Sequence, residues 1–444
     1  MLFSRALASR RFHCGSLRIS LEPYALLGAA SVLGCGGGQT GDEQTGNAGS
    51  VLQELRGTAA RVAANGALPN SASDDGWAFG WKFYHEEAKP NQNAFFSPYS
   101  ISSASAMLVA GANGETKAEI DRALAFSADD GPAFHQARNS IAAALETRNH
   151  AVSEDSNAQA LHVSNDLWLD PGFRPLPTFL DTLSAYYDAG VFLAPFGKDP
   201  EAARQAINAK IATDTEQLIR ELLPEHSVDG SAFVLTNAVY FKSNWVSQFS
   251  KGLTADEPFV NSAGETKSVA MMHGAGGLYY TGSDYQAIAL PYSHDELELV
   301  AIMPTAGTFS QFSANLSAET VATARAALAP APLDLRFPKF QIKSTVPLKE
   351  RLQALGMQQP FTDKADFSRV GEGVFISDAF HQATLTLDED GTEAAAATAF
   401  VAVTVSAPAA PPVPIPVVFD HPFVFFIRDI QTNALLFVGH FANP

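Results

Sequence analysis

The chain ends in the stretch "VVFDHPFVFFIRDIQTNALLFVGHFANP", residues Val417 to Pro444. Two apolar runs lie within it, "FVFFIRD" from Phe423 and "LLFVGHF" from Leu435, and both are rich in the aromatic and β-branched residues that strands prefer. Similar runs recur through the second half of the chain, whereas helical periodicity dominates the first half. Because helices and strands are segregated rather than alternating, the sequence predicts an α+β fold and not a βαβ winding.

A different kind of segment precedes this end, "DEDGTEAAAATAFVAVTVSAPAAPPVPIPVV", residues 388–418. Alanine is the best helix former and Asp390 suits a helix cap, so a solvated helix is one interpretation. An extended strand is the other, because its alternation places small side chains on both faces. One face would carry Thr392, Ala394, Ala396 and Thr398, and the other would carry Glu393, Ala395 and Ala397.

The composition bounds the class of protein. The chain has 444 residues, 46% of them hydrophobic and 10% aromatic, which is enough to bury a sizeable core. The formal net charge of −18 would repel phosphate backbones, so nucleic acid is not an expected partner. No second linker and no internal repeat interrupts the sequence before Asp388, and we therefore expect one domain from residue 72 to residue 444.

The first residues have the features of an export signal. Four arginines form a basic lead, and "YALLGAASVLGC" then supplies an apolar run that is too short to span a bilayer. The final "VLGC", Val32 to Cys35, resembles a bacterial lipobox. We expect a signal peptide at residues 1–34, lipidation of Cys35, and a flexible tether at residues 35–71. The alternative is a plain cleaved signal peptide. Either would place the protein at the cell envelope, on the outer membrane or cell surface, or in the extracellular medium.

Motifs of catalysis are missing from the sequence. It has no Gly-rich phosphate loop, no G-x-S-x-G elbow and no second histidine to complete a zinc motif after His85. Its two cysteines, Cys14 and Cys35, both lie near the start. We therefore expect no enzyme activity, no cofactor and no metal.

Four stretches, in order and at sensible spacing, resemble the serpin family, whose members trap proteases. The first is "NAFFSPYSISSASAMLVAGANGETKAEI" (Asn93–Ile120), which is similar to that family's second helix and the next turn. The second, "TNAVYFKSNWVSQF" (Thr236–Phe249), is similar to its strand-and-breach segment, and the third, "PKFQIKSTVPLKERLQALGM" (Pro338–Met357), is similar to a central-sheet strand and the following helix. The fourth, Val417–Pro444, is similar to the family's C-terminal signature and contains Asp420-His421-Pro422-Phe423. The resemblance implies three β-sheets, about eight to nine helices, and an exposed reactive-centre loop at about residues 389–416.

In inhibitory serpins this loop is a bait, and after cleavage its first half enters the central sheet as a new strand. The resemblance implies a hinge formed by Glu389, Gly391, Thr392, Glu393, Ala394, Ala395, Ala396, Ala397 and Thr398. Counting from Gly391 as in the family places the reactive bond between Val405 and Ser406. Valine suits a shallow uncharged pocket, so the expected target is an elastase-like serine protease. The proline-rich segment 407–416 is longer than usual in the family, and Thr404 and Ala407 remain alternatives for the cleaved residue.

The resemblance also implies a gate under the sheet, formed by Ser97, Ser100, Asn237 and His381, with Trp245 at the end where insertion begins. Lys210 departs from the family pattern, which has tryptophan there, and is expected to loosen the helix that crosses the sheet.

Several functions fit these features. The expected one is a metastable monomer that forms a covalent acyl-enzyme with its target protease and contacts membranes only through its lipid. A non-inhibitory binding or chaperone-like serpin is one alternative, and an inhibitor of cysteine proteases is another. A third is a lipid-anchored adhesion or structural protein that docks through its proline-rich segment.

Overall fold

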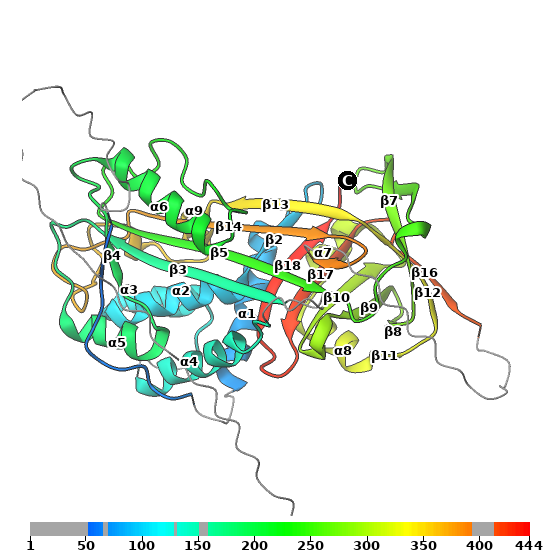
Figure 1. Ribbon diagram of the computed structural model, residues 1–444, viewed down its shortest axis with the longest axis horizontal. Helices are drawn as coiled ribbons and strands as arrows, with labels where there is room; N and C mark the ends of the chain where they lie inside the picture. The colour runs from blue at the N-terminus through cyan, green and yellow to red at the C-terminus, as the bar shows by residue number, and fades with distance from the viewer. Residues whose placement is uncertain (1–51, 65–69, 128–130, 151–158, 393–412) are drawn as a thin grey trace, which may run out of the picture. The chain divides into compact units, whose positions relative to one another are not determined.

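The computed structural model describes residues 52–64, 70–127, 131–150, 159–392 and 413–444 (Figure 1). In these ranges the chain forms nine α-helices and three β-sheets, which confirms the predicted α+β serpin fold. The helices are α1 (Asn70–Glu87), α2 (Pro98–Gly111), α3 (Gly114–Ala123), α4 (Pro132–Glu146), α5 (Pro177–Tyr187), α6 (Pro200–Asp214), α7 (Phe309–Asn315), α8 (Ala318–Ala327) and α9 (Leu348–Ala354).

The three sheets collect strands from distant parts of the chain. The central sheet has the order β1 (Gln53–Leu55), β4 (Val191–Leu193), β3 (Ala160–Leu169), β5 (Phe233–Asn244), β15 (Gly391–Thr392), β14 (Asp378–Leu387) and β13 (Phe340–Val346). The second sheet has the order β11 (Ala329–Pro330), β8 (Leu278–Thr281), β9 (Tyr285–Pro291), β10 (Leu297–Pro304), β17 (Phe423–Asp429), β18 (Leu435–Phe441) and β2 (Ala94–Phe96). The third sheet consists of β16 (Ile415–Val418), β12 (Leu333–Pro338), β7 (Thr266–Ala275) and β6 (Ala255–Val260).

The C-terminal stretch forms the middle of the second sheet. Strands β17 and β18 are antiparallel, from Phe423 opposite Phe441 to Arg428 opposite Leu435. Both strands are buried almost throughout, so they read as continuous apolar runs rather than as alternating ones. On one face Phe426 meets the ring of Trp77 edge-on at 5.3 Å, which packs α1 against this sheet.

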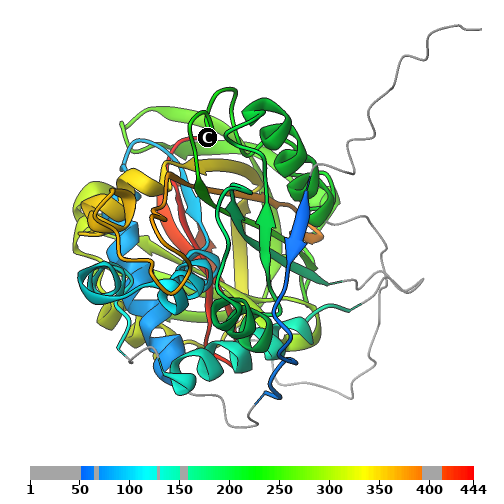
Figure 2. The same ribbon diagram turned by 90° about the vertical axis from the view of Figure 1, so that its left-hand side faces the viewer.

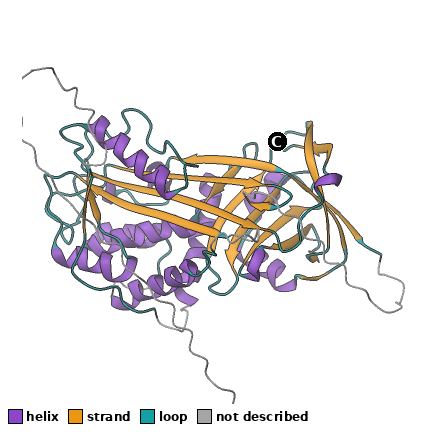
Figure 3. Ribbon diagram, viewed as in Figure 1, coloured by secondary structure: helices purple, strands orange, loops and turns teal. Residues whose placement is uncertain are grey.

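Helices cover the two faces of the central sheet unequally. Helices α2 and α5 lie on the inner face, whereas α6 crosses the outer face (Figures 1 and 3). Helix α2 begins at Pro98, behind the cap residue Ser97, whose side chain accepts a hydrogen bond from the backbone N–H of Ser100 at 3.2 Å. Helix α6 packs Ile207 and Ile211 against Trp168 of the sheet. The central sheet is thus buried on both sides along much of its length.

The predicted tether does not hold for residues 52–64. This segment adds β1 to the edge of the central sheet, antiparallel to β4, with Gln53 opposite Leu193 (Figure 2). Beyond the strand, the backbone N–H groups of Thr58 and Ala59 donate to one carboxylate oxygen of Asp181 on α5, at 2.7 and 3.1 Å. The segment is extended because its backbone partners are supplied by α5 and β4.

No helix within the described ranges is both long and apolar enough to span a bilayer. The expected signal peptide and Cys35 lie outside the described residues.

Candidate functional site

The central sheet contains a seam where two neighbouring strands are only partly paired. Strands β5 and β14 run parallel and pair from Val234 opposite Asp378 to Val239 opposite Ala383. Beyond this point β15 lies between them and is antiparallel to both. Gly391 pairs with Asn244 and Thr392 with Ser243, while Thr392 also pairs with Leu387. The predicted hinge therefore begins as a short strand inside the fork.

Gly391 enters the fork because it has no side chain. A Cβ atom at this position would lie 2.1 Å from the carbonyl oxygen of Ser243 and 2.6 Å from the Cα atom of Asn244. Backbone atoms cannot yield to such contacts, so any other residue would push β15 away from β5. The family resemblance assigns Gly391 to the hinge, and the close approach of the β5 backbone is a physical reason for glycine at this position.

Thr392 shows which face of the hinge is buried. Its side chain is fully buried, and its Oγ1 lies 2.9 Å from the hydroxyl oxygen of Tyr292. Burial raises the pKa of Tyr292, which keeps this phenol protonated and able to donate. The face of β15 that carries Thr392 is therefore the one that points into the core.

Ion pairs anchor the acidic turn before Gly391. Glu389 accepts hydrogen bonds from Lys339 and from Thr254, both at 2.8 Å, and Asp390 pairs with Lys251 at 2.5 Å. Burial alone would raise the pKa of Glu389, but the hydrogen bonds from Lys339 and Thr254 hold it below its usual value. The start of the hinge is thus tied to the segments that flank the third sheet.

Trp245 closes the same end of the fork. Its indole N–H donates to the carbonyl oxygen of Asp388 at 3.0 Å, and its backbone N–H donates to that of Asp390 at 2.8 Å. The indole ring stacks on Tyr292 with a centroid distance of 4.4 Å. The structure therefore places Trp245 against the hinge, where insertion would begin.

The four predicted gate residues come together under the paired part of the seam. His381 of β14 and Asn237 of β5 are register partners, and the Nδ1 atom of His381 hydrogen-bonds the amide oxygen of Asn237. The backbone N–H of Ser97 donates to His381 Nε2 at 3.1 Å, and Ser97 Oγ donates to the carbonyl oxygen of Leu436 at 2.6 Å. This cluster joins both sides of the seam to α2 and the second sheet.

Asn165 on β3 completes the gate, and the sequence analysis missed it. The hydroxyl of Ser100 donates to Asn165 Oδ1 at 2.8 Å, and the amide nitrogen of Asn237 donates to the same oxygen. The signal lies in "LHVSNDLWL", where alternate residues face the core as Leu161, Val163, Asn165 and Leu167. One polar residue on an apolar face requires a buried hydrogen-bond partner, and Asn237 and Ser100 provide it.

His381 must be neutral in this arrangement. Because the N–H of Ser97 points at Nε2, that nitrogen is the acceptor and the ring proton is on Nδ1, facing Asn237. Complete burial lowers the pKa of His381 to about 3. A proton added to Nε2 would also displace the Ser97 hydrogen bond, so charging this ring breaks the gate.

Lys210 does not leave α6 loose on the sheet. Its ammonium group lies 3.0 Å from the carboxylate of Asp166 on β3 and 2.6 Å from that of Asp214. It also lies over the ring of Phe192, 4.8 Å from the centroid. These contacts hold α6 on the sheet, because the ion pair with Asp166 of β3 takes the place of the packing that the family's tryptophan would provide. They do not support the expected loosening of α6.

The remaining predicted residues lie outside the described ranges. They are Glu393, Ala394, Ala395, Ala396, Ala397 and Thr398 of the hinge, Val405 and Ser406 of the reactive bond, and Cys35.

The described residues thus show a fork between β5 and β14 that the short strand β15 enters, above a polar gate, and this arrangement defines the class of the protein. The family model for "Serpin (serine protease inhibitor)" matches residues 76–444, and the chain belongs to the serpin family.

Known proteins resemble this chain over most of its length. It is 33% identical over 370 residues to an uncharacterized serpin-like protein of Thermococcus kodakarensis, covering 83% of this chain and 84% of that protein. It is 33% identical over 374 residues to a leukocyte elastase inhibitor of Bos taurus, covering 81% and 95%. Among solved structures, the native state of the thermophilic serpin tengpin aligns with a TM-score of 0.77 at 24% identity, covering 88% of this chain and 98% of that one. The last likeness shows the fold alone.

Buried neutral histidines make the stability depend on pH. Burial lowers the pKa of His440 to about 4, as it lowers that of His381 to about 3, while both residues titrate near 6.5 when unfolded. Between pH 6.5 and pH 4 the unfolded chain binds more protons, so the free energy of unfolding falls as the pH falls, by up to about 1.4 kcal/mol per pH unit for each histidine. Urea unfolding of His440→Gln between pH 7.5 and pH 4.5 should show a shallower decline than the wild type.

The matched control for this prediction is His226→Gln, because the His226 side chain is 83% exposed. This variant should keep the wild-type slope. If His440→Gln and the wild type lose stability in parallel, burial does not suppress the charge of His440.

Proposed function

We propose that this serpin is an inhibitor that traps an elastase-like serine protease as a covalent acyl-enzyme by inserting its loop into the central sheet. One observation carries the proposal. Strand β15 already lies between β5 and β14, antiparallel to both, and the chain continues from Thr392 into a run of small residues, Ala394 to Ala397. Small side chains are what a segment needs in order to enter between two occupied strands.

The register of β15 indicates the path of insertion. Extending it by two residues would place Ala394 between Phe241 of β5 and Leu385 of β14, which are both buried core residues. The direct parallel pairing of β5 with β14 would then be replaced by two antiparallel pairings, which are slightly more stable per residue. About a dozen new ladder residues, at about 0.5–1.5 kcal/mol net per hydrogen bond, supply the driving force. The uncut protein is therefore held kinetically.

The chemistry is that of the target protease. Its serine hydroxyl attacks the carbonyl carbon of Val405, the bond to the nitrogen of Ser406 breaks, and Ser406 leaves as a free amine. An ester then links Val405 to the protease. Insertion of the freed segment carries the ester away from its starting position and distorts the attached enzyme before water can hydrolyse the bond. The serpin supplies no catalytic group and is consumed, one molecule per protease.

Two observations support the elastase-like preference. Valine is small and uncharged, and the sequence contains no lysine or arginine from Gly391 to Ile427, which disfavours a trypsin-like target. The chain also resembles a leukocyte elastase inhibitor at 33% identity over 374 residues.

Incubation with an elastase-type serine protease should give a band at the summed mass on denaturing electrophoresis, with the cut mapped to Val405 by mass spectrometry. Val405→Arg should transfer complex formation to a trypsin-type enzyme, because the primary pocket of that enzyme binds a cation.

Cleavage without any complex would favour a non-inhibitory serpin, and a complex with a cysteine protease alone would replace the target class. If the cleaved protein melts no higher than the intact one, the loop does not insert, as expected of the adhesion or structural alternative.

The two faces of the hinge provide a sharper test. Ala394→Arg would force a charged group between Phe241 and Leu385, where no partner is available, and should reduce complex formation at least about tenfold while cleavage continues. Glu393→Gln changes the outer face, opposite half-buried Lys242, without placing two cations opposite each other, and should retain trapping. Densitometry of complex and cleaved bands measures both. Equal loss in the two variants would contradict the proposed register.

We further propose that the protein is exported and lipid-anchored through Cys35. The basic lead, the short apolar run and "VLGC" support this location. The protein purified from its native membrane should begin at Cys35 and carry the added mass of its lipid, whereas Cys35→Ser should appear in the soluble fraction. An unmodified Cys35 in the wild type would leave a plain signal peptide as the explanation.

A further inference from the structure

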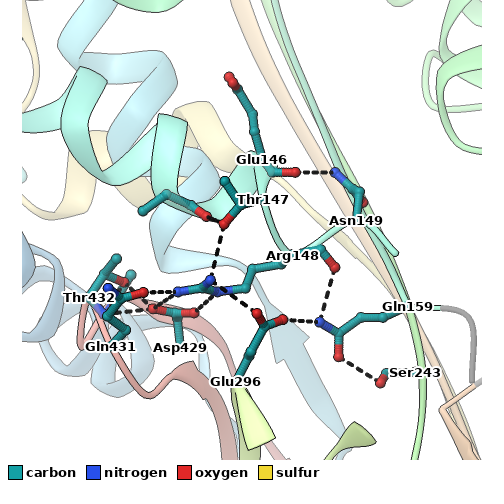
Figure 4. Close-up of polar contacts among 12 residues, drawn as sticks. Glu146, Thr147, Arg148, Asn149, Gln159, Ser243, Glu296, Asp429, Gln431 and Thr432 are labelled. Atoms are coloured by element: carbon teal, nitrogen blue, oxygen red, sulfur yellow. Dashed lines mark hydrogen bonds and ion pairs between the residues drawn. The ribbon is translucent and has the colours of Figure 1, made fainter. Parts of the chain in front are cut away.

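A polar cluster whose members are buried, except for half-buried Glu296, ties β3 and β5 of the central sheet to the second sheet, close to the hinge (Figure 4). We call its members Arg148, Gln159, Glu296 and Asp429 the latch. Gln159 lies directly before β3, and its side-chain amide donates to the carbonyl oxygen of Arg148 at 3.0 Å and to the carboxylate of Glu296 at 3.2 Å. Glu296 lies in the turn between β9 and β10, and so belongs to the second sheet. Gln159 is thus hydrogen-bonded to the segment that follows α4 and to the turn between β9 and β10, both of which lie outside the central sheet.

Arg148 fixes the other end of the latch. Its Nε donates to Asp429 at 2.6 Å and its Nη2 donates to Gln431 at 2.7 Å, while its Nη1 reaches Glu296 at 3.3 Å. Asp429 is fully buried and also accepts from the backbone N–H and the hydroxyl of Thr432. Because every group around Asp429 is already committed, Arg148 cannot shift without leaving a buried charge unpaired.

The latch reaches the seam through one hydrogen bond. The hydroxyl of Ser243, on β5, donates to Gln159 Oε1 at 2.8 Å, and Ser243 is the register partner of Thr392 in the hinge. Ser243 and Gln159 are both buried. The chain of contacts therefore runs from the site where β15 enters, across β5 and β3, to the turns of the second sheet.

Insertion of a strand must strain this connection. A new strand separates β5 from β14 by about one strand spacing, about 4.8 Å. On the far side of the seam, β13 packs on the second sheet through the stacked rings of Phe340 and Phe441, at 4.5 Å. On the near side, Phe241 of β5 packs on Phe437 of the same sheet, and such apolar contacts can slide. The hydrogen bonds of Gln159 are directional and cannot follow a displacement of that size.

We infer that Gln159 and Arg148 are positioning residues that hold β3 and β5 against the second sheet and so set the rate at which the central sheet opens. This inference rests on the proposed function, in which opening precedes insertion. The latch slows insertion in the uncut protein, and its hydrogen bonds yield when the cleaved loop enters.

The test measures opening without a protease. A synthetic peptide of residues 392–404, "TEAAAATAFVAVT", is mixed with the full-length uncut protein, and its annealing into the sheet is followed by native electrophoresis and by the rise in the melting temperature. Gln159→Leu removes the amide but keeps most of its volume. When the sheet of the wild-type protein opens, some of the three hydrogen bonds of the Gln159 side chain must break. The variant lacks these bonds, so the peptide should anneal about tenfold faster.

A matched control separates the latch from general destabilisation. Arg138→Met breaks the buried pair between Arg138 of α4 and Asp75 of α1, at 3.1 Å, which does not involve the central sheet. It should lower the melting temperature of the intact protein but change the annealing rate less than about twofold. Should Gln159→Leu fail to fold, Ser243→Ala removes the bond to Gln159 together with a long contact to the carbonyl oxygen of the adjacent Asn244, and should accelerate annealing about threefold.

The outcomes distinguish the two proposals. Annealing of Gln159→Leu at the wild-type rate, or equal acceleration in Arg138→Met, overturns the latch. Faster annealing in Gln159→Leu alone, in a protein that forms no covalent complex with any protease, supports the latch and overturns the proposed inhibition. If the peptide anneals to neither the wild type nor any variant, the sheet does not open and both proposals fall.

Discussion

The partial pairing of β5 with β14 is the constraint on which the rest of the structure depends. Their parallel ladder ends at Val239 and Ala383, and beyond it, within the part of the chain that the structure describes, Gly391 and Thr392 lie between the two strands. An edge inside a sheet is a site for another strand, since its backbone groups pair best with a neighbour. In the proposed mechanism, occupation of these edges by the loop would give a more fully bonded arrangement of the same chain, and barriers between the two arrangements would maintain the native one.

Those barriers are polar rather than apolar. His381 and Asn237 bind each other across the seam, Trp245 binds the carbonyl groups of the hinge turn, and Lys210 holds α6 to Asp166 on the outer face. Apolar contacts alone would resist the separation of β5 from β14 only weakly, because such contacts tolerate sliding. Hydrogen bonds in a buried setting resist it strongly until they break, because an unpaired polar group there is costly. In the proposed mechanism, such groups set the barrier that must be crossed before the sheet opens.

The sequence predicted the parts of this arrangement that are local or that resemble the family. The α+β class followed from the segregation of helical and strand periodicity, and the hinge and gate residues followed from family stretches. In the sequence, Asn165 was recognisable only as a polar residue on the apolar face of a strand. Its part in the gate depends on α2, which packs beneath β3 and carries Ser100. The docking of residues 52–64 was not predictable, because this extended segment gains its order from contacts with Asp181 and β4, which are distant in the sequence. The latch combines four distant segments, so no local pattern indicates it.

The direction of β15 explains why the hinge is acidic on one side and small on the other. Glu389 and Asp390 are held by Lys339 and Lys251 outside the fork, so the turn before Gly391 would stay fixed during the proposed insertion. A pivot needs one immobile side. If the acids were free, the hinge could withdraw from the fork, and β5 would lose the partner that keeps its end separated from β14. The charges outside the seam and the small residues entering it are therefore two requirements of one motion, an anchored turn and an unobstructed strand.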